Sequence, residues 1–106
     1  MKLAVLSDLH ANRQATEAVW EHARQQACDH TVLLGDYVDY GADPVWVLDF
    51  VQERVKEGAI AIKGNHDDAV RHEGAHQMAG HVQASLDWTR QQLSSAHVAF
   101  IESLPL

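Results

Sequence analysis

Three short, mainly apolar runs are separated by segments with helical periodicity. The runs cover residues 2–7, 31–34 and 59–63, and they are continuous rather than alternating, which is typical of strands buried on both faces of a sheet. Helices are expected over about residues 12–27 and from Asp43 to Gly58, between successive runs. The order β-α-β-α-β predicts an α/β fold with a right-handed parallel sheet.

Apolar spacing predicts which side of each helix is buried. In the first helix the shared side holds Ala15, Ala18, Val19, His22, Ala23 and Gln26, and in the second it holds Val45, Leu48, Val51 and Val55. Asp43 is a good N-cap, and Pro44 suits the first helical turn. After residue 68 the pattern predicts helices over 81–93 and 94–104 without further strands.

Polar residues follow each predicted strand at its carboxyl end. They are Asp8 and His10 after the first run, Asp36 and Asp39 after the second, and Asn65 and His66 after the third. Ligands of parallel α/β sheets gather at these ends, so the side chains are expected to lie together. Carboxylates, imidazoles and amide oxygens are ligands for divalent metal ions, so the pattern predicts a metal site.

The spacing of these residues suggests how they would share the ions. Asp8 and His10 are two apart in a segment expected to be extended, so both point the same way and can chelate one ion. A carboxylate such as Asp36 can donate an oxygen to each of two ions, and Asn65 offers a neutral oxygen to the second.

His66 is expected to face the substrate rather than to act only as a ligand. A protonated imidazole there could stabilise charge on a phosphate and give its proton to the leaving oxygen. Such an imidazole needs a carboxylate partner, and Asp39 is the natural candidate.

The segments "DLH", "GDYVDYG" and "GNHD" resemble the first three motifs of the calcineurin-like metallophosphoesterases. The resemblance implies an αββα sandwich and two divalent ions, commonly manganese, iron, zinc or nickel. It places Asp8, His10 and Asp36 on one ion, Asp36 and Asn65 on the other, and makes His66 the catalytic imidazole backed by Asp39. Members hydrolyse phosphate monoesters or diesters with a metal-bridging hydroxide as nucleophile.

Two departures from the family pattern modify these expectations. Tyr40 stands where protein phosphatases carry an arginine, which disfavours that activity and is similar to bacterial and archaeal phosphoesterases. The family's later Gly-His and Gly-His-x-His motifs do not occur in residues 1–106. We therefore expect a single truncated domain, the first half of the sandwich, with one weak metal site at most and impaired hydrolysis.

The truncation has a packing consequence. One face of the sheet would lack the second sheet that covers it in the complete sandwich. Exposed apolar patches of this kind usually associate, so the expected partners are a second copy of the chain or a C-terminal fragment.

Composition narrows the partners and the compartment. The formal net charge of −7 argues against non-specific binding of nucleic acid. Cys28 is the single cysteine, so no internal disulfide forms, which fits a reducing cytoplasm. The apolar run before Asp8 is too short for a signal peptide or a membrane span.

Other interpretations remain open from the sequence. The chain could be a non-catalytic metal-binding or interaction module, or a generic nucleotide-binding domain, although it lacks a glycine-rich phosphate loop after the first run. Asp67 and Asp68 are expected to cap a helix, and His72, His76 and His81 to lie on a solvated helix face.

Overall fold

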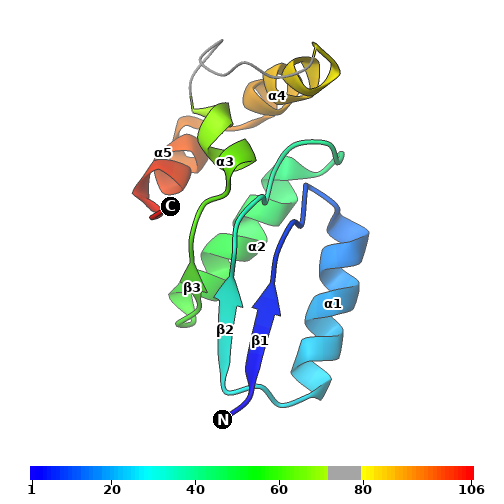
Figure 1. Cartoon of the computed structure of the whole chain (residues 1–106), viewed down its shortest axis with the longest axis vertical. Helices are drawn as coiled ribbons and strands as arrows, with labels where there is room; N and C mark the ends of the chain where they lie inside the picture. The colour runs from blue at the N-terminus through cyan, green and yellow to red at the C-terminus, as the bar shows by residue number, and fades with distance from the viewer. Residues whose placement is uncertain (72–79) are drawn as a thin grey trace.

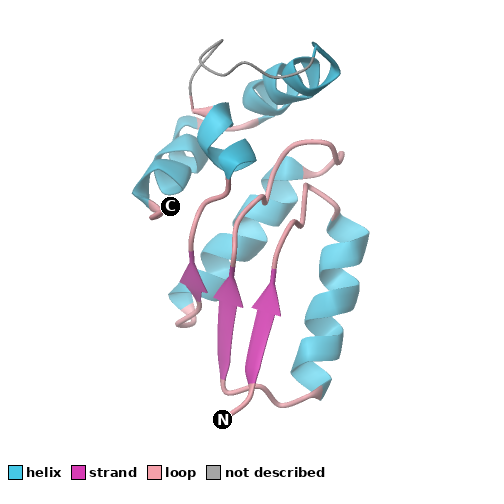
Figure 2. Ribbon diagram, viewed as in Figure 1, coloured by secondary structure: helices cyan, strands magenta, loops and turns pink. Residues whose placement is uncertain are grey.

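Three parallel strands and five helices make up residues 1–71 and 80–106, which the computed structural model describes (Figure 1 and Figure 2). The strands are β1 (Leu3–Leu6), β2 (His30–Leu33) and β3 (Ile60–Ala61), and the helices are α1 (Arg13–Gln25), α2 (Pro44–Lys56), α3 (Asn65–Val70), α4 (Gly80–Gln92) and α5 (Ser95–Ser103). The predicted α/β fold and its β-α-β-α-β order are confirmed. None of the helices in these two ranges is long and apolar enough to cross a membrane.

The sheet has the strand order β1-β2-β3 with all neighbours parallel. Consecutive strands joined by right-handed crossovers place their helices on the same face, and α1 indeed contacts α2. Leu33 and Ala61, which are paired in the register, are buried on this helical face. Strand β3 is only two residues long, so the third predicted strand is shorter than its apolar run.

The opposite face of the sheet is apolar and open. Val5, Val32 and Ile60 pair in one row across the three strands, and Val5 and Ile60 are 54% and 64% exposed. The prediction that the strands are buried on both faces is therefore wrong for these residues. The uncovered face expected from the first half of a sandwich is present in the described ranges.

Helix α1 begins after Asn12, whose Oδ1 accepts the N–H of Ala15 at 2.9 Å. Its predicted apolar side is not the buried side, because Val19 is exposed whereas Thr16 and Ala23 are buried. The reason is position: α1 lies beside the edge strand β1, so only the side facing the sheet and α2 is covered (Figure 1).

Helix α2 supplies the centre of the core. Pro44 occupies its first turn as predicted, although the Asp43 side chain forms no capping hydrogen bond. Leu48 and Val51 from the predicted stripe are fully buried, together with Val47. These side chains fill the space between the sheet and the helices that follow it.

Helices α3, α4 and α5 gather beyond the carboxyl end of the sheet (Figure 1). Helix α3 contacts both α4 and α5, with Val70, Leu86 and Ile101 fully buried. The Lys63 N–H donates to the Pro105 carbonyl at 2.7 Å, so the last residues return to the segment that follows β3. Ser94 caps α5 as predicted. The predicted positions of His72 and His76 lie outside the described residues.

Two glycines offer a matched test of the turn that follows β2. Gly35 and Gly58 have φ of 102° and 107°, a region that costs L-residues about 1–2 kcal/mol. A Cβ at Gly35 would also lie 2.4 Å from the Gly64 nitrogen, whereas a Cβ at Gly58 meets nothing within 4 Å. We expect Gly58→Ala to lower the free energy of unfolding by about 1 kcal/mol and Gly35→Ala by about 3 kcal/mol or more in urea titrations. Equal losses would contradict this close packing of the two strand ends.

Candidate metal centre

The three segments that follow the strands lie side by side at the carboxyl edge of the sheet. The loop after β1 runs along the loop after β2 through backbone hydrogen bonds from Asp8 N–H to Gly35 O at 3.0 Å and from His10 N–H to Asp36 O at 2.9 Å. The loop after β3 joins them, because the His66 N–H donates to Asp36 Oδ1 at 3.1 Å. The predicted convergence of the strand ends is confirmed.

Left-handed backbone is concentrated in these loops. Non-glycine residues with φ between 43° and 78° there are Asp8, His10, Ala11, Asp36, Asp39 and Tyr40. Such conformations are costly for residues with a Cβ and cluster at functional sites, where the surrounding structure fixes them. The assumption that Asp8 and His10 lie in an extended segment is wrong, although their side chains are neighbours.

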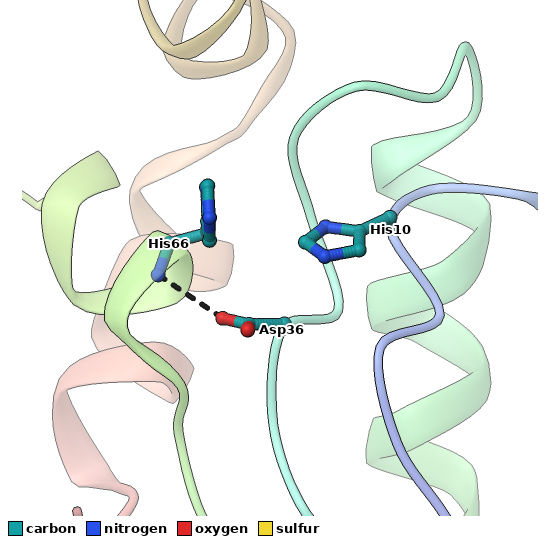
Figure 3. Close-up of side chains that lie close together, drawn as sticks. All are labelled: His10, Asp36 and His66. Carbon is teal, nitrogen blue, oxygen red and sulfur yellow. Dashed lines mark hydrogen bonds between the residues drawn. The ribbon is translucent and has the colours of Figure 1, made fainter. Parts of the chain in front are cut away.

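His10, Asp36 and His66 form the group best suited to hold a metal ion. One ligand atom from each lies within 4.8 Å of the others, and the three side chains come from three different loops (Figure 3). No close approach of a side chain to Asp36 from α3 would be tolerated, since a Cβ at Gly64 would lie 2.1 Å from Asp36 Oδ1. The glycine before Asn65 therefore gives the carboxylate its space.

Both imidazoles are oriented by a hydrogen bond on Nδ1. His10 Nδ1 lies 3.0 Å from the Val38 carbonyl, and His66 Nδ1 lies 2.8 Å from Asp39 Oδ2. A nitrogen that faces a carbonyl or a carboxylate carries the proton, so each Nε2 has a lone pair available. Ligating histidines in metalloproteins are usually held in this way. The expected contact between Asp39 and His66 is present.

Asp8 lies at the border of the group. Its Oδ1 is 3.5 Å from His10 Nε2, and its Oδ2 accepts the Ser7 hydroxyl at 2.5 Å. The Ser7 hydrogen bond, with a contribution from His10, lowers the pKa of the Asp8 carboxyl, so it is ionised at neutral pH. Asn65 is exposed at the first residue of α3, next to His66. The roles of Asp8 and Asn65 as ligands stay predictions.

Asp67 has a larger part in the site than the helix cap expected from the sequence. Its carboxylate is fully buried and accepts the N–H groups of Asp36 at 2.7 Å, Tyr37 at 2.9 Å, Val38 at 3.2 Å and Gly64 at 2.9 Å. Only the last of these bonds is a cap. Burial raises the pKa of Asp67 to about 6, against the lowering effect of the backbone hydrogen bonds.

Two further charged residues are paired away from the metal group. The Arg71 guanidinium, whose direction the sequence left open, lies 2.7 Å from Asp68 Oδ1. Lys63 Nζ lies 3.6 Å from the same oxygen. Tyr40 is placed at the site itself, with its ring 5.0 Å from that of His10 and 5.1 Å from that of His66. It is more than half exposed.

Fold and site together define an α/β domain with imidazoles and carboxylates converging at the carboxyl edge of its sheet. The family model for calcineurin-like phosphoesterases matches residues 1–102, and the chain belongs to that family.

Several relatives agree with this assignment. The chain is 33% identical to phosphodiesterase YfcE of Escherichia coli K12 over 119 residues, and 29% identical to the uncharacterized protein MJ0912 of Methanocaldococcus jannaschii over 105 residues. These matches cover 99% and 98% of this chain, but only 62% and 42% of the two relatives. The chain thus spans about half of the length of such proteins.

Solved structures show the same relation. A metallophosphoesterase from Sphaerobacter thermophilus superposes with a TM-score of 0.80 at 33% identity, over 99% of this chain and 41% of that one. A putative diadenosine tetraphosphatase superposes with a TM-score of 0.67 over 98% of this chain and 47% of that one. Its identity is 21%, so it supports the fold alone.

Replacing Asp67 tests whether one carboxylate holds two strand ends together. In Asp67→Asn an amide N–H₂ must face backbone N–H donors, so the free energy of unfolding should fall by about 3 kcal/mol. Asp68→Asn is the matched control, because Asp68 forms partly exposed ion pairs and should cost about 1 kcal/mol or less. Urea titrations of both variants measure the difference, and similar losses would refute the special role of Asp67.

Proposed function

We propose that this chain is the N-terminal half of a metal-dependent phosphoesterase, a single domain over residues 1–106. The observation that carries the proposal is the group of His10, Asp36 and His66, in which His66 is backed by the buried carboxylate of Asp39. A divalent ion suits this set of donors, because imidazole nitrogen and carboxylate oxygen are common ligands of manganese, iron, zinc and nickel.

Each residue has a distinct role in this proposal. His10 and Asp36 hold the first ion together with Asp8, while Asn65 and Asp36 serve the second ion that the family resemblance implies. When bound, the ions supply charge neutralisation and an activated water for attack on phosphorus. His66 holds a proton on the imidazole near the leaving oxygen, and Asp39 keeps the ring oriented through Nδ1.

The donor count argues for incomplete metal binding. Asp8, His10 and Asp36 can hold one ion with an open position, whereas Asp36 and Asn65 alone are too few for a second. We therefore propose one weak site in this chain and hydrolysis that is impaired relative to complete homologues. The cytoplasmic location expected from the single cysteine stays a prediction.

A phosphodiester is the preferred substrate class in this proposal. One relative is named a phosphodiesterase, and Tyr40 stands where protein phosphatases carry arginine. A groove of about 740 Å³, lined in part by Asp8, His10 and Tyr40, gives access to the group. An exposed aromatic ring beside two imidazoles suits a substrate with an organic group on the phosphate.

Two histidine variants separate metal binding from turnover. His10→Ala should weaken manganese binding in calorimetry by about tenfold or more. His66→Ala should leave binding within about threefold but abolish manganese-stimulated hydrolysis of a model phosphodiester, because the imidazole acts on the leaving group. His97→Ala is the control, since His97 pairs with Asp49 in another part of the chain.

Three outcomes would contradict this assignment. Two tight manganese ions per chain would refute the single weak site. Loss of metal binding in His66→Ala would make His66 a ligand instead. Metal binding without turnover in the unaltered chain would favour a non-catalytic module.

The open sheet face supports a second candidate function, an interaction module. Leu3, Val5 and Ile60 expose apolar side chains on one side of the sheet, and Leu34 is also exposed. We infer that this face binds a second copy of the chain or a C-terminal fragment that completes the sandwich, because removing such side chains from water favours association.

Replacing apolar side chains of the open face tests this association. Val5→Thr combined with Ile60→Thr keeps β-branched residues in the strands while reducing apolar exposure. In sedimentation velocity the unaltered chain should form dimers or larger species, and the double variant should shift toward the monomer. Val55→Thr on α2, outside this face, serves as the control. A monomeric unaltered chain that binds no apolar dye would contradict the proposal.

A further inference from the structure

Asp39, the carboxylate behind His66, is itself held by a residue from a distant helix. Its side chain is fully buried and receives three donors. His66 Nδ1 lies 2.8 Å from Oδ2, the Tyr40 N–H donates to Oδ1 at 2.9 Å, and the hydroxyl of Ser85 donates to Oδ1 in a short hydrogen bond. A carboxylate accepts only, so the hydroxyl hydrogen must point from Ser85 to Asp39.

Ser85 lies on α4, 46 positions after Asp39 in the sequence. Its oxygen also accepts the N–H of Tyr40 at 3.0 Å, so one hydroxyl is both a donor and an acceptor. Asp39 and Tyr40 have φ of 78° and 69°. The serine therefore bonds to both left-handed residues of this turn and fixes the carboxylate and the peptide beside it.

We propose that Ser85 is a positioning residue that orients the His66 imidazole through Asp39. With Oδ1 fixed, Oδ2 stays aimed at Nδ1, which keeps the proton on Nδ1 and leaves Nε2 directed toward the site. Without the hydroxyl, a buried oxygen loses one of its donors, and the carboxylate gains freedom to rotate. The consequence for catalysis rests on the proposed function, whereas the consequence for the imidazole does not.

The imidazole can be followed in the metal-free protein by proton and ¹⁵N NMR. The unaltered chain should show a slowly exchanging Nδ1–H proton on His66. In Ser85→Ala its exchange should accelerate by about tenfold or more, because the hydrogen bond to Asp39 is less well held. Ser85→Thr retains the hydroxyl and should restore slow exchange, while Gln91→Ala, an exposed change on the same helix, should have no effect.

A second variant covers the case in which Ser85→Ala unfolds. Ser85→Cys preserves the shape but is a weak donor, so it should accelerate exchange in the same direction. Slow exchange in the alanine and cysteine variants would overturn the proposal. So would the absence of a protected Nδ1–H proton in the unaltered chain, or a failure of threonine to restore it.

Kinetics then test the catalytic consequence. With manganese and a model phosphodiester, Ser85→Ala should lower kcat by about tenfold while KM and the manganese Kd change by less than about twofold. Altered exchange in a chain that hydrolyses nothing would uphold the positioning role and refute the proposed function. Altered exchange with unchanged kcat would refute the catalytic consequence alone.

Discussion

The Asp67 carboxylate joins the ends of β2 and β3 at the point where the sheet itself stops. The paired register ends at Leu33 and Ala61, and β3 has only two residues, so backbone pairing between these strands is short. Four backbone N–H groups, from residues 36–38 and from Gly64, converge on this one buried side chain instead. A buried acceptor has no water to replace its partners, so the two loops are strongly constrained to their relative positions. Asp36 and His66 meet because these loops do.

The loop after β1 is fixed by backbone rather than by a side chain. Asp8, His10 and Ala11 donate in turn to Gly35, Asp36 and Tyr37, which continues the parallel pairing of β1 with β2 beyond the strands. The left-handed conformations in this loop cost free energy, and these hydrogen bonds offset part of that cost. The same backbone path turns His10 toward Asp36 while its Nδ1 meets Val38. Backbone strain and side-chain orientation thus have a common origin in the pairing of two loops.

Local features of the sequence were sufficient for the order of strands and helices and for the convergence of their ends. Continuous apolar runs and the handedness of crossovers act over short distances, and chemical residues directly after a strand must lie at its end. The buried side of α1 could not be predicted in this way, since it depends on α1 lying at the edge of the sheet. The left-handed backbone of Asp8 and His10 depends on pairing with residues 35–37, a long-range effect. Asp67 gave a signal in the motif "GNHD", but one that also reads as an ordinary helix cap. Ser85 gave none, because 46 residues separate it from Asp39.

Two sets of groups make up the site, and they differ in how complete they are. The inner set, His10, Asp36 and His66, faces the space where an ion would bind. The outer set, the Val38 carbonyl with the Asp39, Asp67 and Ser85 side chains, holds the inner set in place. Every member of the outer set lies within this chain, so the orientation of the inner donors needs no other segment. The number of donors is a separate matter, because an open three-ligand site suits one ion while a dinuclear centre requires more. Orientation is therefore a property of this half of the fold, whereas metal affinity depends on how many further donors complete the site.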